Sequence, residues 1–187
     1  MKYAACVLIA AALLAATAAD ARVRNVTDPD APRSLPAEGP VSVQWTDPAE
    51  FTDLKFSGNR WEARQGNWVY QLAEHLRKSA AKQLPQGDRL EVTIQDFDRA
   101  GHYEPWRGAQ MQDVRIVRDI YPPSMKLEFR HYGADGQLLA EGTREIRDMG
   151  FLVRGPQLRG SDNLQYEKRM IDDWVRDELR KSAVASN

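Results

Sequence analysis

Asp96, Asp98 and His102 are the residues whose types and spacing come closest to a chemical motif. They form the pattern Asp-x-Asp-x-x-x-His at the end of an expected strand. Two carboxylates and a nearby imidazole carry donor atoms that suit a divalent cation, and such an ion would activate water in a hydrolase. The alternative is structural, because aspartates at strand ends accept backbone N–H groups in turns. Since the sequence shows no further cluster of ligands, we favour the structural interpretation and expect no cofactor.

Asp96 has another interpretation, in which it pairs with Arg144. Each shares the two-residue period of the apolar positions in its own expected strand, so both would point towards the core. Buried charges are rarely tolerated alone, and this predicts an Asp96–Arg144 ion pair beneath the helices. The competing account is a β-bulge that turns Asp96 outward. Phe97 favours the bulge, because regular alternation would leave its ring in solvent.

The loop over residues 101–112 and the stretch after it hold the candidates for binding. Trp106 lies off every apolar stripe and precedes Arg107, a composition typical of interaction hot spots. The alternative is a lid, with Trp106 folded back over a sheet edge. Arg115 and Arg118 offer contacts to an anionic group, such as a lipid headgroup or a peptidoglycan carboxylate, although cross-strand ion pairs are the simpler expectation.

Several function classes are disfavoured by what the sequence lacks. There is no G-x-S-x-G, no H-E-x-x-H and no glycine-rich phosphate loop. The chain has 26 basic and 27 acidic residues, mixed along its length, and so lacks the basic stripe of a nucleic-acid binder. The only cysteine is Cys6, which excludes disulfides and thiolate chemistry from the rest of the chain.

Residues 1–21 indicate export. Met1 and Lys2 form a positive start, residues 3–19 carry no charge, and the small-x-small sequence at 19–21 suits signal peptidase. We expect cleavage after Ala21 and a location in the periplasm or outside the cell. An uncleaved anchor is the alternative, but the uncharged run is short for a bilayer. Cys6 lies too early to be a lipoprotein cleavage site, so no lipid anchor is expected.

The rest of the chain divides into a linker, one domain and a tail. Residues 22–40 contain four prolines and no apolar periodicity, which predicts an extended linker. Residues 41–182 carry the strand and helix patterns of a single domain. Residues 183–187 are expected to be a disordered tail.

The element order predicts the fold class. Alternating apolar residues indicate strands at 41–45, 90–94, 114–117 and 125–130, with a return strand to about 146 after an Asp-Gly turn. Apolar residues at helical spacing indicate a helix over 60–84, capped by Asn59, and a second one that begins near Asp162. We therefore expect a two-layer α+β domain: an antiparallel-rich sheet of four to five strands, with two amphipathic helices packed on one face.

Five ordered motifs together resemble one known family. They are the segment 43–47 with its Trp-Thr-Asp, Ile94 to Gly101, Arg115 to Pro123, Arg147 to Leu152, and Tyr166 to Trp174. This resembles DUF3016, a family of exported proteins of Gram-negative bacteria that has no assigned activity. The resemblance implies a periplasmic or secreted protein of one domain.

Taken together, these features favour a non-catalytic binding or accessory domain that contacts an envelope protein or another envelope component. The rival hypothesis is a metal-assisted hydrolase that uses Asp96, Asp98 and His102. The two differ in what they require of the fold. Binding requires an exposed Trp106, and hydrolysis requires three ligands gathered around one ion.

Overall fold

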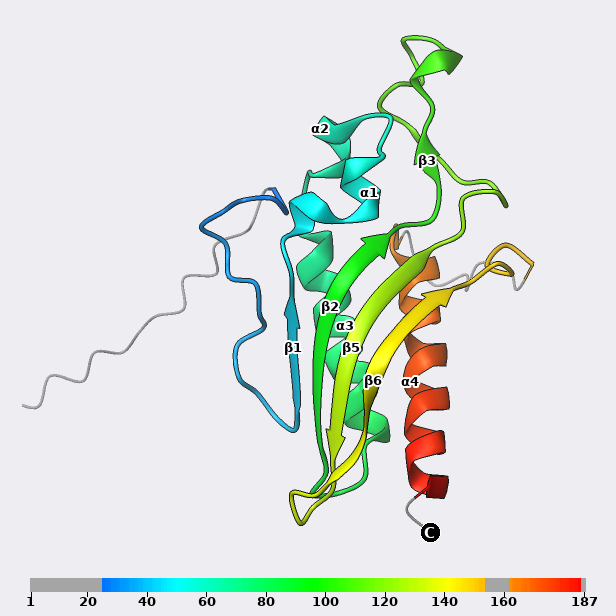
Figure 1. Cartoon of the computed structure of the whole chain (residues 1–187). Coiled ribbons are helices and arrows are strands. Elements are labelled where there is room, and N and C mark those ends of the chain that lie inside the picture. The colour runs from blue at the N-terminus through cyan, green and yellow to red at the C-terminus, as the bar shows by residue number, and fades with distance from the viewer. Residues whose placement is uncertain (1–24, 154–161, 186–187) are drawn as a thin grey trace, which may run out of the picture.

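A four-stranded sheet with two long helices on one face forms the body of the molecule (Figure 1). The computed structural model describes residues 25–153 and 162–185. In chain order, the sheet strands are β1 (Val41–Trp45), β2 (Arg89–Asp98), β5 (Ser124–Tyr132) and β6 (Leu138–Arg147), and the long helices are α3 (Trp68–Gln83) and α4 (Gln165–Ala185). The predicted α+β class, with a largely antiparallel sheet, is confirmed.

The strands follow the order β1-β2-β5-β6. β1 runs parallel to β2, and the other two pairs are antiparallel. A parallel pair needs a long crossover connection. Here it consists of the 3-10 helix η1 (Pro48–Glu50), the short helices α1 (Thr52–Lys55) and α2 (Arg60–Ala63), and α3. The β5–β6 hairpin turns at the expected Asp-Gly pair, with Gly136 at φ +81°.

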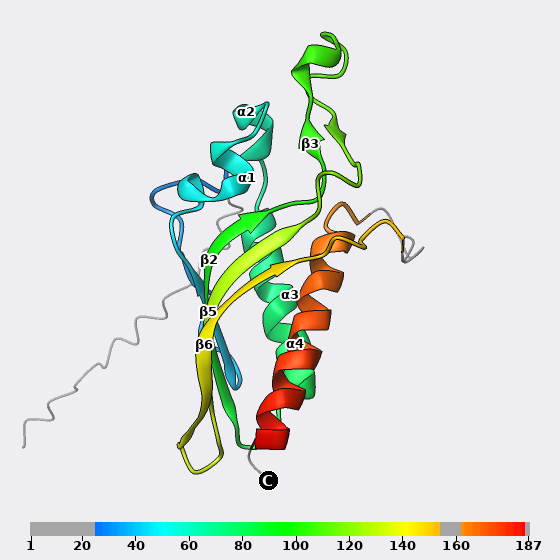
Figure 2. The ribbon, with the colours of Figure 1, turned by 45° about the vertical axis from the view of Figure 1, so that its right-hand side comes forward.

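Alternation in β1, in β5 and in β2 up to Ile94 explains which face is covered. In these stretches the apolar side chains alternate with polar ones and point towards α3 and α4. Figure 2 shows both helices on this face of the sheet. Burying one large aliphatic or aromatic side chain contributes about 1.5–3 kcal/mol. The most deeply buried of these side chains include Leu72, Leu76, Ile94, Leu127, Phe129 and Ile171.

The single helix expected over 60–84 is two helices, so that expectation is wrong at its N-terminal end. Asn59 does cap α2, because its side chain accepts the N–H of Glu62. The chain then breaks before α3, and Gly66 adopts a φ of +82° that only glycine tolerates easily. As a result Trp61, expected in the core, is 58% exposed, whereas Trp68 is buried.

The N-terminal segment is not a free linker from residue 25 onward. Val26 and Leu35 are buried within the hydrophobic core. Residues 33–35 lie against the outer edge of β1, where Leu35 donates its N–H to Val43 and Trp45 donates to Arg33. The folded unit therefore begins before residue 41. At the other end α4 continues to Ala185, beyond the predicted start of the tail; the predicted signal peptide lies outside the described residues.

The stretch predicted as a third sheet strand forms part of a separate projection. β4 (Arg115–Ile116) pairs with β3 (His102–Tyr103) in a two-stranded sheet, with the 3-10 helix η2 (Pro105–Arg107) between them. We call residues 101–121 the arm. Its base is closed by a hydrogen bond of 3.0 Å from the Gly101 N–H to the Tyr121 carbonyl. The arm extends beyond the end of the sheet where β2 finishes (Figures 1 and 2).

Candidate functional site

A cavity of about 230 Å³ lies where the C-terminal end of β2 meets α1 and the base of the arm. We call it the β2-end cavity. α1 is held over the sheet because its first residue, Thr52, donates both its N–H and its hydroxyl to Asp96, each at 2.6 Å. The lining residues are Thr52, Asp53, Phe56, Ser57, Asp98, His102, Tyr103 and Arg115.

The floor of the cavity is a buried charge cluster around Asp53. Its carboxylate is inaccessible to solvent and accepts hydrogen bonds from Arg99, at 2.7 and 3.1 Å, and from Arg115. The guanidinium groups also donate to the carbonyls of Ala63 and Ala100, both at 2.9 Å. Burial by itself raises the pKa of Asp53, but the two positive charges, Arg115 first, hold it below its ordinary value. Asp53 is therefore ionised, and its single negative charge lies against the two positive charges of Arg99 and Arg115.

Asp98 is the lining group that is not satisfied. Among the described residues its carboxylate makes no hydrogen bond and no ion pair. Burial, and then the negative charge of Asp53, raise the pKa of Asp98 from 3.8 to about 6. Above that pH the cavity wall carries a partly buried carboxylate without a counter-ion, which is an uncommon state for a buried polar group.

His102 is held by main-chain carbonyls. Its Nε2 lies 3.0 Å from the Phe56 oxygen, and its Nδ1 lies 2.9 Å from the Tyr103 oxygen. Burial, and then the charge of Arg115, lower the pKa of His102, so the ring is neutral at pH 7. A neutral imidazole carries a single N–H, so His102 donates to one of these two carbonyls at a time. Donation to Phe56 ties the arm to the segment after α1.

The three residues of the alternative metal site do not gather around one point. Within residues 25–153 and 162–185, no group of three histidine, cysteine, aspartate or glutamate side chains is placed to hold a metal ion. Asp96 binds the start of α1 through Thr52, and His102 faces carbonyls. Asp98 and His102 do share the cavity.

The predicted ion pair between Asp96 and Arg144 is wrong, and the competing β-bulge is confirmed. The register shifts between Ile94 and Asp96, so Phe97 enters the core and Asp96 lies opposite Lys126 on the outer face. Arg144 points to the helical face instead, where it forms two hydrogen bonds with Glu178, at 2.8 and 2.7 Å. One extra residue in β2 thus places the two expected partners on opposite faces.

Trp106 is 70% exposed on η2, near the end of the arm. The carboxylate of Glu104 lies just beneath, inaccessible to solvent, and is bound by Tyr121 at 2.7 Å, by Arg118 at 3.1 Å and by Arg107. These hydrogen bonds, that from Tyr121 first, lower the pKa of Glu104. The arm is thin, so the carboxylate is shielded by its own partners rather than by the body of the domain. The interpretation of Trp106 as a folded-back lid is not supported.

Each of the three arginines named as binding candidates is paired with a carboxylate. Arg115 pairs with Asp53, and Arg107 and Arg118 pair with Glu104. These pairs lie within the arm and between the arm and α1, not across the outer face of the main sheet. Ion pairing thus explains Arg115 and Arg118 better than an anion site.

Three buried acids that organise this end of the molecule could not be identified from sequence patterns. Asp53 and Glu104 have the contacts described above, and Glu167 of α4 accepts the Ala100 N–H at 2.7 Å. Burial raises the pKa of Glu167. Apart from Arg107, three residues after Glu104, their side-chain and backbone partners described above are 14 to 67 residues distant along the chain, beyond the reach of a local pattern.

Exposed apolar side chains collect at this end too. Phe56 and Trp61 lie on or next to α1 and α2, Trp106 on the arm and Met149 in the loop after β6, each more than half exposed. These segments lie at the same end of the molecule in both views (Figures 1 and 2). Since large exposed apolar groups are informative when they gather, this end is the candidate surface for binding.

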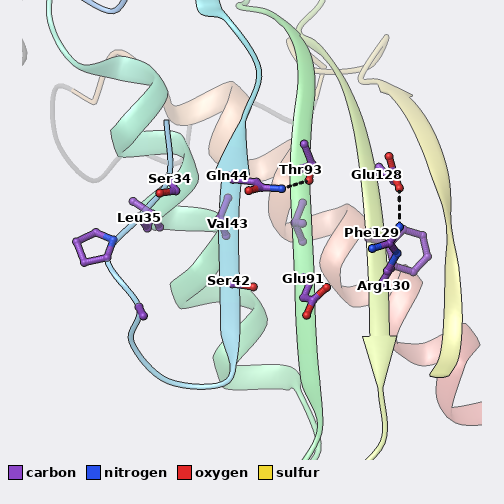
Figure 3. Close-up of a pocket in the computed structure, with 13 residues that line it drawn as sticks. Ser34, Leu35, Ser42, Val43, Gln44, Glu91, Thr93, Glu128, Phe129 and Arg130 are labelled. Atoms are coloured by element: carbon purple, nitrogen blue, oxygen red, sulfur yellow. Dashed lines mark hydrogen bonds and ion pairs between the residues drawn. The ribbon is translucent and has the colours of Figure 1, made fainter. Parts of the chain in front are cut away.

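A groove of about 280 Å³ crosses the outer face of the sheet beside residues 34–37 (Figure 3). Some of its polar side chains bind one another: Gln44 donates to Thr93 at 2.9 Å, and Arg130 lies 3.6 Å from Glu128. The groove shares no lining residue with the β2-end cavity.

Comparisons with known proteins agree with this description. Among the described residues, no helix combines the length and the apolar composition needed to cross a membrane. No curated protein and no solved structure matches the chain significantly. A family profile described as "Protein of unknown function (DUF3016)" matches residues 39–177, which span β1 to most of α4. The chain therefore belongs to the DUF3016 family.

Proposed function

We propose that this protein is an exported, periplasmic binding module that contacts an envelope protein or another cell-envelope component through the arm. The observation that carries the proposal is the exposure of Trp106 on a projection that is fixed from beneath. Tryptophan and arginine are the residues that dominate binding energy in interfaces. A rigid, exposed tryptophan loses little conformational freedom on binding, which favours affinity.

The neighbouring surface supports the same function. The segments that carry Trp61, Phe56 and Met149 lie at the same end of the molecule as the arm, and each of these side chains is more than half exposed. The opposite end carries a single large exposed apolar side chain among the described residues, Leu138. A binding module of this kind needs no catalytic group, and the buried charges around Glu104 then serve to hold the arm rigid.

The experiment is site-specific photo-crosslinking in cells that export the protein. A photo-reactive amino acid at Gln110, exposed on the arm, is combined with Trp106→Ala or, as a control at the opposite end of the molecule, with Leu138→Ala. We expect a discrete adduct that disappears with Trp106→Ala and persists with Leu138→Ala. Both variants should unfold at the urea concentration of the parent, because both side chains are exposed.

An adduct of unchanged yield in the Trp106→Ala variant would overturn the proposal.

Export is tested separately by the mass of the protein recovered from the periplasm. We expect a chain that begins at Arg22. A full-length chain in the cytoplasm would contradict this part of the proposal.

A further inference from the structure

We propose that the β2-end cavity binds a single primary ammonium group on an alkyl chain, with Asp98 as its counter-ion. This site is distinct from the arm surface, because Trp106 does not line the cavity. The same chemistry has two sources: a free alkylamine, or a lysine side chain of a partner.

The size of the cavity limits the ligand. Pockets for drug-sized ligands measure about 300–1,000 Å³, and the β2-end cavity measures about 230 Å³. A nucleotide or a sugar chain does not fit such a volume, whereas one unbranched side chain does. The rim includes Phe56, which is 70% exposed and lies where a hydrocarbon chain would enter.

The charge of the lining selects a cation. The carboxylate of Asp53 is already bound by Arg99 and Arg115, so these three groups offer little to a ligand. Asp98 remains, with no hydrogen bond or ion pair within the described residues. The positive charges of Arg115 and Arg147 act on Asp98 from a distance, but neither forms an ion pair with it. A bound cation can form the ion pair that Asp98 lacks, whereas an anion would lie against its negative charge.

Neutral oxygen atoms complete a site for an ammonium group rather than for a metal ion. An ammonium group has three donors and needs three acceptors. Ser57 and Tyr103, which each carry a hydroxyl group, line the same cavity as Asp98. The Tyr103 ring is already in a cation–π contact with Arg115, at 5.5 Å, so only its hydroxyl is counted. Burial raises the pKa of Tyr103, so its hydroxyl stays neutral.

The test is a nuclear magnetic resonance titration of the exported form of the protein at pH 8, where Asp98 is ionised. Pentylammonium is the probe, and 1-pentanol is the uncharged control of the same shape. A blocked tripeptide with central lysine is compared with its norleucine analogue. We expect saturable shifts at the amides of Ser57, Asp98 and Tyr103 with the charged probes only.

Asp98→Asn should weaken binding about tenfold or more, since a charge-assisted hydrogen bond contributes about 1.5–3 kcal/mol. Asp30→Asn, the same change at an exposed position, and Trp106→Ala should both bind as the parent does. Tighter binding of the peptide assigns the site to a partner's lysine, and tighter binding of pentylammonium assigns it to free amines.

Absence of saturable shifts, equal binding of pentanol, or full binding by Asp98→Asn would each overturn the inference. These outcomes are independent of the crosslinking at Gln110, so either proposal can fail without the other.

Discussion

Asp98→Asn is expected to stabilise the protein at neutral pH and to have little effect in acid. The unfolded chain ionises this carboxyl near pH 3.8, whereas the folded protein ionises it near pH 6. Between these values the folded state holds the proton more tightly, so the contribution of Asp98 to the free energy of unfolding falls as the pH rises from 4 to 6. Well above pH 6 Asp98 is ionised in both states, and the destabilisation caused by its burial as a charge has reached its full value. An asparagine keeps the shape of the side chain and cannot ionise.

The magnitude follows from the pKa difference. A shift of about two units corresponds to about 3 kcal/mol at about 1.4 kcal/mol per unit. Asp98 is partly exposed, and solvent screening reduces this figure. We expect Asp98→Asn to raise the free energy of unfolding by about 1–2 kcal/mol at pH 7.5 and by less than about 0.5 kcal/mol at pH 4.

Urea unfolding of the exported form of the protein at the two pH values measures this directly. Asp30→Asn serves as the control and should change stability little at either pH. Because the parent and the variant are compared at each pH, the titration of every other group cancels. An equal change at pH 4 and pH 7.5, or a wild type more stable than Asp98→Asn at pH 7.5, would refute the reasoning.

Three further changes test the supports of the site by urea unfolding at pH 7.5. Asp53→Asn should cost about 3–5 kcal/mol, because it leaves two buried guanidinium groups without a counter-ion, whereas Glu50→Gln, in an exposed pair, should cost less than about 1 kcal/mol; equal losses would contradict the role of burial. Gly101→Ala should cost about 1–3 kcal/mol, since Gly101 has φ +81° and an added Cβ would lie 2.8 Å from the Ile116 carbonyl oxygen; a neutral result would show that the base of the arm can move. Leu35→Ala should lower the free energy of unfolding by about 2–3 kcal/mol, because its side chain is buried in the core. An unchanged urea midpoint would show that this segment does not contribute to the folded unit.

The parts of the fold that were predicted from the sequence are those with local causes. The β5–β6 hairpin depends on alternation and on an Asp-Gly turn, both visible within 25 residues. Burial of Trp68 and Trp174 follows from helical spacing. Trp61 has the same helical spacing but is exposed, because the chain changes direction at Gly66. Periodicity alone cannot detect such a change of direction between two helices.

The candidate site was less accessible to prediction, because its geometry depends on contacts between distant segments. The bulge in β2 is the instructive case. One inserted residue reverses the facing of every later side chain in the strand, and the apolar Phe97 at an expected polar position was its only sign. The partnership of Asp53 with Arg99 and Arg115 had no sign at all, since 46 and 62 residues separate the partners.

The contact of residues 33–35 with β1 has a consequence for how the chain associates. Without that segment, β1 would be an edge strand with unpaired N–H and C=O groups, which are templates for pairing with another chain. A protein shortened to begin at residue 41 would expose this edge while keeping the rest of the sheet. The N-terminal segment therefore protects against self-association through β1 in addition to contributing the buried side chains of Val26 and Leu35 to the core.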